Sequence, residues 1–122
     1  MTPVAVIDPG PIPYEAIELT GDPDLESGLR RAGYEPASTC YRLIELPLAL
    51  VGDTYGMSNW QHVDTYKEVV TALRRGGMFP PIVVMPTTNG VTLVDGVSRT
   101  YAHWLLRRAS IRAYELLTAE RT

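Results

Sequence analysis

The sequence predicts a single α+β unit, and three observations support this class. The chain has 122 residues, enough for one domain, and 45% of them are apolar, which suffices for one core. Asn89-Gly90 separates two β-branched runs, which is a typical hairpin pattern. Apolar residues with helical spacing occur on both sides of that hairpin, so strands and helices alternate in the second half of the chain.

The first half of the chain predicts short elements. Residues Val4–Ile7 have the character of a short strand, and the proline-rich residues 8–13 that follow exclude a helix. Leucines at helical spacing predict a short helix over Asp24–Ala32, with Asp22 or Asp24 as its N-cap. Residues 41–46 predict a strand, because their apolar side chains partly alternate and Pro47 follows them.

The second half predicts a longer succession of elements. Asp64 is a good N-cap for a helix that Gly76-Gly77 ends, and Pro80-Pro81 restarts the chain in extended form. A helix after the hairpin is expected to bury Tyr101 or Ala102, Leu105, Leu106 and Ala109. The expected elements are a helix over 65–75, strands over 82–85 and 91–94, a helix over 97–109 and a last strand over 111–117.

Composition excludes several classes of protein. There are 11 basic and 14 acidic residues, and a domain that mainly binds a nucleic-acid backbone is usually clearly basic, so DNA is not an expected partner. Cys40 is the one cysteine, which permits no intrachain disulfide and favours a cytoplasmic location. The longest apolar stretch, residues 46–51, is too short to cross a membrane.

The junction Asp95-Gly96 is the richest local signal, because a strand passes there into a helix with Arg99 in its first turn. The first amides of a helix have no partner inside it and attract anions, whereas a cation at that end is disfavoured. Gly96 permits close approach of a ligand, Ser98 offers a hydroxyl, and Arg99 offers a charged fork for phosphate oxygens. Asp95 can hold a metal ion or accept a proton. Spacing alone leaves a purely structural alternative open, in which Asp95 caps the helix and pairs with Arg99.

The two histidines offer fewer clues. His103 lies one turn beyond Arg99 on the same helix face, and His62 lies just before the expected cap Asp64. Two histidines without a nearby cysteine argue against a tetrahedral zinc site.

Three segments together resemble the ParB/sulfiredoxin-like superfamily. They are PPIVV at residues 80–84, LVDGVSRTYAH at 93–103 and IRAYEL at 111–116. The resemblance covers about residues 41–117 and implies a small mixed β-sheet packed by two or three helices. It divides the chain into a Pro/Gly-rich extension, residues 1–40, and a ParB-like domain, residues 41–122. The extension has no assigned counterpart in the superfamily. Its role stays open: it could pack on the core, cover the site or form an interface.

The resemblance also implies a ligand. Members of the superfamily bind the phosphates of ATP or another nucleotide at this helix start, usually with Mg²⁺. Carried over to this chain, Gly96, Val97, Ser98 and Arg99 would bind the nucleotide, with His103 one turn further along, and Asp95 would position the metal ion or the acceptor hydroxyl.

Departures from the motif bear on catalysis more than on binding. Val97 stands where sulfiredoxins carry a cysteine, which argues against sulfiredoxin activity. Small ParB-like kinases of free amino acids read Asp-Gly-His-His-Arg, and Ser98 stands where their second histidine would be. Their base is a glutamate before the first long helix, which is absent here. His62 or Asp64 could take its place, and His62 is the candidate base because Asp64 is also needed as a cap.

Two functions follow from the resemblance. In the first, the chain transfers a phosphoryl group from ATP or ADP to a small hydroxylated metabolite such as a free amino acid, with Asp95, His62 and Ser98 as the catalytic residues. In the second, it is a non-catalytic module that binds a nucleotide or a protein for regulation. The sequence leaves open whether the chain is an enzyme and whether it forms a homodimer.

Overall fold

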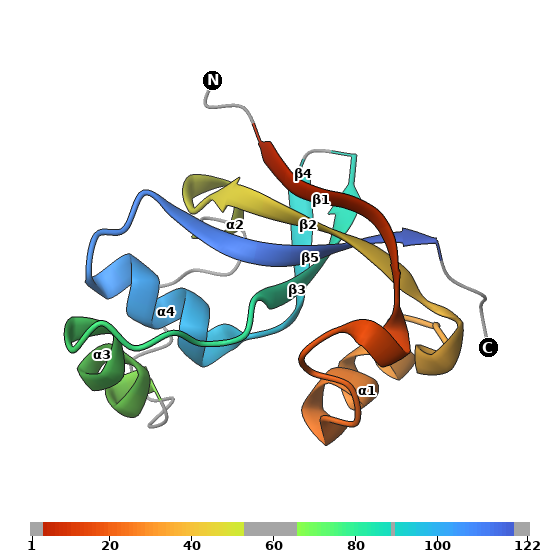
Figure 1. Ribbon diagram of the computed structural model, residues 1–122, viewed down its shortest axis with the longest axis horizontal. Helices are drawn as coiled ribbons and strands as arrows, with labels where there is room; N and C mark the ends of the chain where they lie inside the picture. The colour runs from red at the N-terminus through yellow and green to blue at the C-terminus, as the bar shows by residue number, and fades with distance from the viewer. Residues whose placement is uncertain (1–3, 53–65, 89, 119–122) are drawn as a thin grey trace.

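A computed structural model describes residues 4–52, 66–88 and 90–118, and its centre is one five-stranded sheet (Figure 1). The strands lie in the order β1-β2-β5-β3-β4. Neighbours are antiparallel except β3 and β5, which are parallel, so the sheet is mixed and the predicted α+β class is confirmed. The strands are β1 (Ala5–Pro13), β2 (Cys40–Pro47), β3 (Ile82–Thr87), β4 (Gly90–Asp95) and β5 (Ser110–Thr118).

The described residues contain three nine-residue helices and one short one, close to the two or three expected. In Figure 1, α1 lies below the right-hand part of the sheet, and α3 and α4 lie side by side at the lower left. The helices are α1 (Pro23–Arg31), α2 (Ala49–Gly52), α3 (Tyr66–Arg74) and α4 (Val97–Leu105), with 3₁₀ turns η1 (Tyr14–Ala16) and η2 (Pro36–Ser38). None of the helices in these residues is long and apolar enough to cross a membrane.

The start of α1 follows from local chemistry. The Asp22 side chain accepts hydrogen bonds from the backbone N–H groups of Asp24 and Leu25, at 2.8 and 3.2 Å. These are two of the amides that lack a partner inside the helix, and Pro23 at the first position needs no such partner. Asp22 is therefore the N-cap, one of the two residues predicted for that position.

Helix α4 ends earlier than predicted. It stops at Leu105, and Arg107 then adopts a left-handed conformation with φ of 55°. The backbone N–H groups of Arg107 and Arg108 close this turn on Trp104 and His103. Tyr101 and Ala102 are buried as expected, and Leu106 is half-buried. The expectation that Leu105 and Ala109 are buried is wrong: Leu105 is the exposed last residue of the helix, and Ala109 is exposed beyond its end.

Two apolar clusters pack on the two faces of the sheet, because successive side chains of a strand point to opposite faces. In β3, Ile82 and Val84 belong to one cluster and Val83 belongs to the other. The first, the aliphatic core, contains Ile44, Leu46, Leu48, Val51, Ile82, Val84, Val91, Ile111 and Ala113. The second, the tyrosine core, contains Tyr14, Ile17, Leu25, Leu29, Tyr41, Val83, Tyr114 and Leu116.

Residues 4–40 share this sheet and this core with the rest of the chain. β1 pairs with β2, and α1 packs against β4. Gly28 allows that approach, since a Cβ there would lie 2.6 Å from the backbone oxygen of Val94. The division at residue 40 stays a prediction, but the extension brings α1 close to the start of α4.

Candidate functional site

Gly96 forms the corner at which β4 becomes α4. Its φ is 116°, a left-handed value that glycine tolerates best, and a Cβ there would lie 2.5 Å from Cγ2 of Ile82. Both the backbone N–H and the hydroxyl of Thr100 donate to the Gly96 carbonyl, at 2.9 and 2.8 Å. The corner is therefore fixed by its own backbone, and a glycine provides no side chain to cap the helix.

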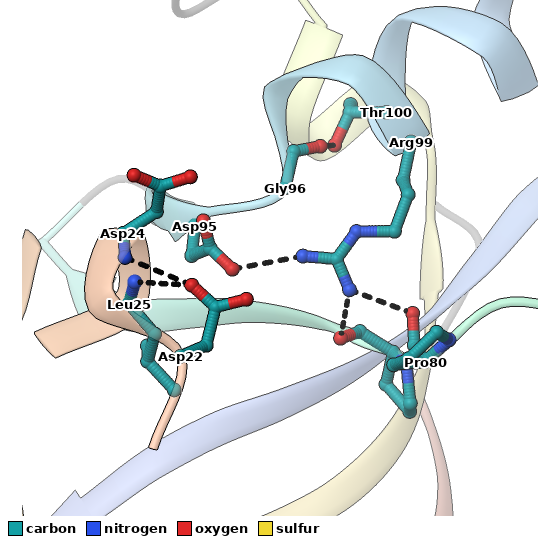
Figure 2. Close-up of polar contacts among 9 residues, drawn as sticks. Asp22, Asp24, Leu25, Pro80, Asp95, Gly96, Arg99 and Thr100 are labelled. Carbon is teal, nitrogen blue, oxygen red and sulfur yellow. Dashed lines mark hydrogen bonds and ion pairs between the residues drawn. The ribbon is translucent and has the colours of Figure 1, made fainter. Parts of the chain in front are cut away.

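Arg99 turns back from the first turn of α4 and is held on three sides (Figure 2). Its Nη2 donates to Oδ2 of Asp95 at 2.9 Å, and its Nη1 donates to the carbonyls of Pro80 and Pro81 at 2.8 and 2.9 Å. This arrangement ties the end of β4 and the start of α4 to the chain before β3. The pairing with Asp95 that spacing left open is present, but Asp95 does not cap the helix.

Burial penalises both charges of this pair. The side chains are 12% and 16% exposed, and burial lowers the pKa of Arg99 and raises that of Asp95, although each charge favours the ionised form of the other. Asp22 and Asp24 also raise the pKa of Asp95. A second positive charge, in addition to that of Arg99, would therefore stabilise the Asp95 carboxylate.

Asp22 and Asp24 reach the site from α1 and were not predicted as site residues. Figure 2 shows Asp22 facing Asp95 and Arg99 across a gap, with Asp24 above it. The sequence indicates only that these residues cap a helix. No local signal indicates that the helix packs beside residue 95, about 70 residues further along the chain.

A cavity of about 560 Å³ lies between α1 and the start of α4. A volume of this size is in the range of ordinary small-molecule sites. Its lining includes the predicted Asp95, Gly96, Val97, Ser98 and Arg99, together with Asp22, Asp24 and Arg31. We refer to it as the α4-start cavity. The structure thus brings together five of the predicted site residues.

The remaining predicted residues lie elsewhere. His103 lines a second cavity, of about 240 Å³, and its Nδ1 is 2.7 Å from the Arg99 carbonyl oxygen. Burial lowers the pKa of His103. His62, the candidate base, lies outside the described residues.

The charges of the α4-start cavity indicate what fits there. Three carboxylates face two guanidinium groups, so a bare phosphate would meet net negative charge. The described residues contain no group of three or more side chains suited to hold a metal ion. Mg²⁺ usually takes only one or two protein carboxylates and keeps waters and phosphate oxygens as its other ligands. Asp95 fits that role, and a divalent ion would offset the excess of carboxylates.

Comparisons with known proteins identify the fold. No protein-family model matches the chain, and no curated protein matches it. The structure is similar to that of sulfiredoxin from Arabidopsis thaliana, with a TM-score of 0.50 and 25% sequence identity, over 60% of this chain and 82% of that one. The fold is therefore ParB/sulfiredoxin-like, and the resemblance inferred from PPIVV, LVDGVSRTYAH and IRAYEL is confirmed at the level of this superfamily.

Proposed function

We propose that the chain binds the phosphates of ATP or another nucleotide together with Mg²⁺ in the α4-start cavity, and transfers a phosphoryl group to a small hydroxylated metabolite such as a free amino acid. The observation that carries the proposal is the cavity itself. It lies at the N-terminal end of a nine-residue helix, where backbone amides and the helix dipole favour an anion.

Asp95 has the central role in this proposal. Its carboxylate would be one ligand of Mg²⁺, which supplies positive charge to the phosphate oxygens when bound. Arg99 donates a hydrogen bond to Oδ2 of Asp95 at 2.9 Å, so it holds the carboxylate in place and engages one of its two oxygens. The amides at Val97 and Ser98 are the groups nearest to a phosphate at the helix start. His62 remains the proposed base.

A second candidate is a non-catalytic module that binds a nucleotide or a protein. One observation favours it: the guanidinium of Arg99 already bonds to Asp95 and to two backbone carbonyls. That bonding gives Arg99 a structural purpose without any ligand. Ser98, at the position of a kinase histidine, is in accord with this alternative.

Calorimetry with ATP, ADP, CTP and GTP in the presence of Mg²⁺ tests the proposal. At least one nucleotide should bind more tightly than 1 mM, a free energy of about −4 kcal/mol. Asp95→Asn replaces a charged ligand of Mg²⁺ with a neutral amide and should weaken Mg-nucleotide binding by about tenfold or more. Glu68→Gln on the exposed side of α3 serves as the matched control and should leave the affinity unchanged.

Two results would separate the candidates. Binding of no nucleotide at millimolar concentration would exclude the phosphate site in both of its forms. Nucleotide binding without turnover, across a panel of free amino acids and other small alcohols, would exclude the phosphotransferase and leave the regulatory module.

A further inference from the structure

The two edge strands of the sheet differ in how well they are covered. β4 forms one edge, where α1 and α2 both pack against it, and each of its six residues is buried or half-buried. β1 forms the other edge and pairs with β2 along its inner side. The first five residues of β1, Ala5–Pro9, are all exposed. β1 is therefore the open edge of the sheet.

The two halves of this edge are built differently. Residues 8–13 contain three prolines, and the pairing with β2 shifts in register on both sides of Asp8. Prolines, charged residues and bulges are the usual features that prevent an edge strand from pairing with another chain. Residues 4–7 have no proline and no charge, and Ala5 and Val6 pair with β2 in regular register. We refer to residues 4–7 as the open segment.

The open segment can pair with a further strand through its backbone and through its side chains. In an antiparallel pair, every second residue turns its N–H and C=O groups toward the neighbouring strand, and the residues between turn theirs outward. Val6 and Ile7 point to opposite faces of the sheet, yet they are 48% and 50% exposed. A strand added beside β1 would therefore cover apolar surface on both faces.

A second copy of the open segment complements the first. In an antiparallel pair centred on Val6, Val6 faces its own counterpart, and the small Ala5 faces the large Ile7. Like charges directly opposite each other destabilise a strand pair, and the centre of this pair is uncharged. Asp8 would face an apolar side chain, and its carboxylate already accepts a hydrogen bond from the Gly10 N–H at 2.9 Å.

The same pairing would extend the aliphatic core. Val6 is opposite Ile44 in the register of β1 and β2, so it stands on the face to which Ile44 belongs. Val4 packs against that core as well. Val6 thus forms an exposed apolar border of the aliphatic face, and two such valines would cover each other.

We propose that two copies of the chain associate through the open segment, pairing antiparallel about Val6 and joining their sheets edge to edge. So short a contact buries less area than a standard protein interface, so the dimer is expected at roughly millimolar rather than nanomolar protein. In Figure 1, β1 lies at the top and α1, α3 and α4 lie below the sheet. These helices line the two cavities, so both cavities stay open in the dimer, whose formation requires no nucleotide.

Sedimentation equilibrium and amide NMR of the full chain, at protein concentrations up to about 1 mM, test the proposal. Wild type should pass from monomer to dimer, and the amide signals of the open segment should shift more than those of β4. Val6→Lys places two like charges opposite each other and should weaken association at least tenfold. Leu117→Lys is the matched control, because Leu117 lies on β5 and is 42% exposed, and it should leave association unchanged. A wild type that stays monomeric, or equal losses in both variants, would overturn the proposal.

A cross-link tests the register and carries the test alone if Val6→Lys unfolds. Facing residues of an antiparallel pair have Cα atoms about 4.5–5.5 Å apart, which a disulfide can bridge. Val6→Cys, in a chain that also carries Cys40→Ser, should therefore oxidise to a covalent dimer. Leu117→Cys in the same background should do so at least tenfold more slowly. Equal rates of cross-linking would contradict the pairing about Val6.

Discussion

The two faces of the sheet are built differently, although the same strands supply both. Among the described residues, the members of the aliphatic core all come from residues 44–113, and none of these buried side chains is aromatic. Half of the tyrosine core comes from Tyr14, Ile17, Leu25 and Leu29, so this face is complete only when the first part of the chain packs on it.

Both cavities receive charged residues from the tyrosine-core side of the molecule, and Ile111 of the aliphatic core also lines the second one. Glu45 and Arg112 alternate with aliphatic-core residues along their strands, so their side chains point to the opposite face. The α4-start cavity includes Asp22 and Asp24 of α1, the helix whose buried leucines belong to the tyrosine core. Among the described residues, the tyrosine-core side thus contributes Glu45, Arg112 and α1 to the two cavities, and the aliphatic core contributes Ile111.

The largest expected effect comes from a matched pair of leucines on the two faces. Leu29 and Leu46 are both fully buried, and Leu29→Ala and Leu46→Ala should each lower the free energy of unfolding by about 2–5 kcal/mol. Because Leu29 lies on α1, its replacement should also weaken Mg-nucleotide binding in protein that is still folded, whereas Leu46→Ala should not. Urea denaturation and calorimetry measure the two properties. Equal losses of nucleotide affinity in both variants would contradict the idea that α1, rather than the aliphatic core, supports the binding site.

A smaller effect is expected at Asp22, where capping and charge can be separated. Asp22→Ala removes the acceptor for two backbone amides and should lower the free energy of unfolding by roughly 0.5–2 kcal/mol. Asp22→Asn keeps a good cap and should leave stability nearly unchanged. Both variants remove one carboxylate from the α4-start cavity, so both should increase the affinity for inorganic phosphate without Mg²⁺. An increase in Asp22→Ala alone would assign the effect to the cap instead of the charge.

The smallest expected effect is a pH dependence at His103. Burial lowers the pKa of His103 in the folded chain, so below its ordinary value of about 6.5 the unfolded chain binds a proton more readily than the folded one. Stability should therefore fall as the pH decreases through that value. The hydrogen bond with the Arg99 carbonyl and the charge of Glu45 oppose this lowering of the pKa, whereas the charges of Arg108 and Arg99 add to it. The loss in unfolding free energy from pH 7.5 to 5.5 should be larger in wild type than in His103→Gln, and an equal loss would show that His103 does not contribute.

Local sequence was sufficient to predict most of the elements. The Asn-Gly signal predicts the β3–β4 hairpin, partial alternation predicts β2, and Asp22 is a recognisable cap, because turns, pleats and caps depend on residues close in sequence. The end of α4 was missed, since no glycine or proline indicates the left-handed turn at Arg107. The candidate site was predicted only in its contiguous part, residues 95–99.

What the sequence by itself determined is a strand-to-helix corner with a carboxylate and an arginine four residues apart, in the pattern of a superfamily. Tertiary structure alone decided what surrounds that corner. The carbonyls of Pro80 and Pro81 accept from Arg99 because β3 lies beside β4, and Asp22 faces Asp95 because α1 packs on that strand. Glu45 and Arg112 meet because β2 and β5 pair across 67 positions of the chain. Such contacts depend on which elements pack together, and that depends on the burial of whole faces rather than on any local pattern.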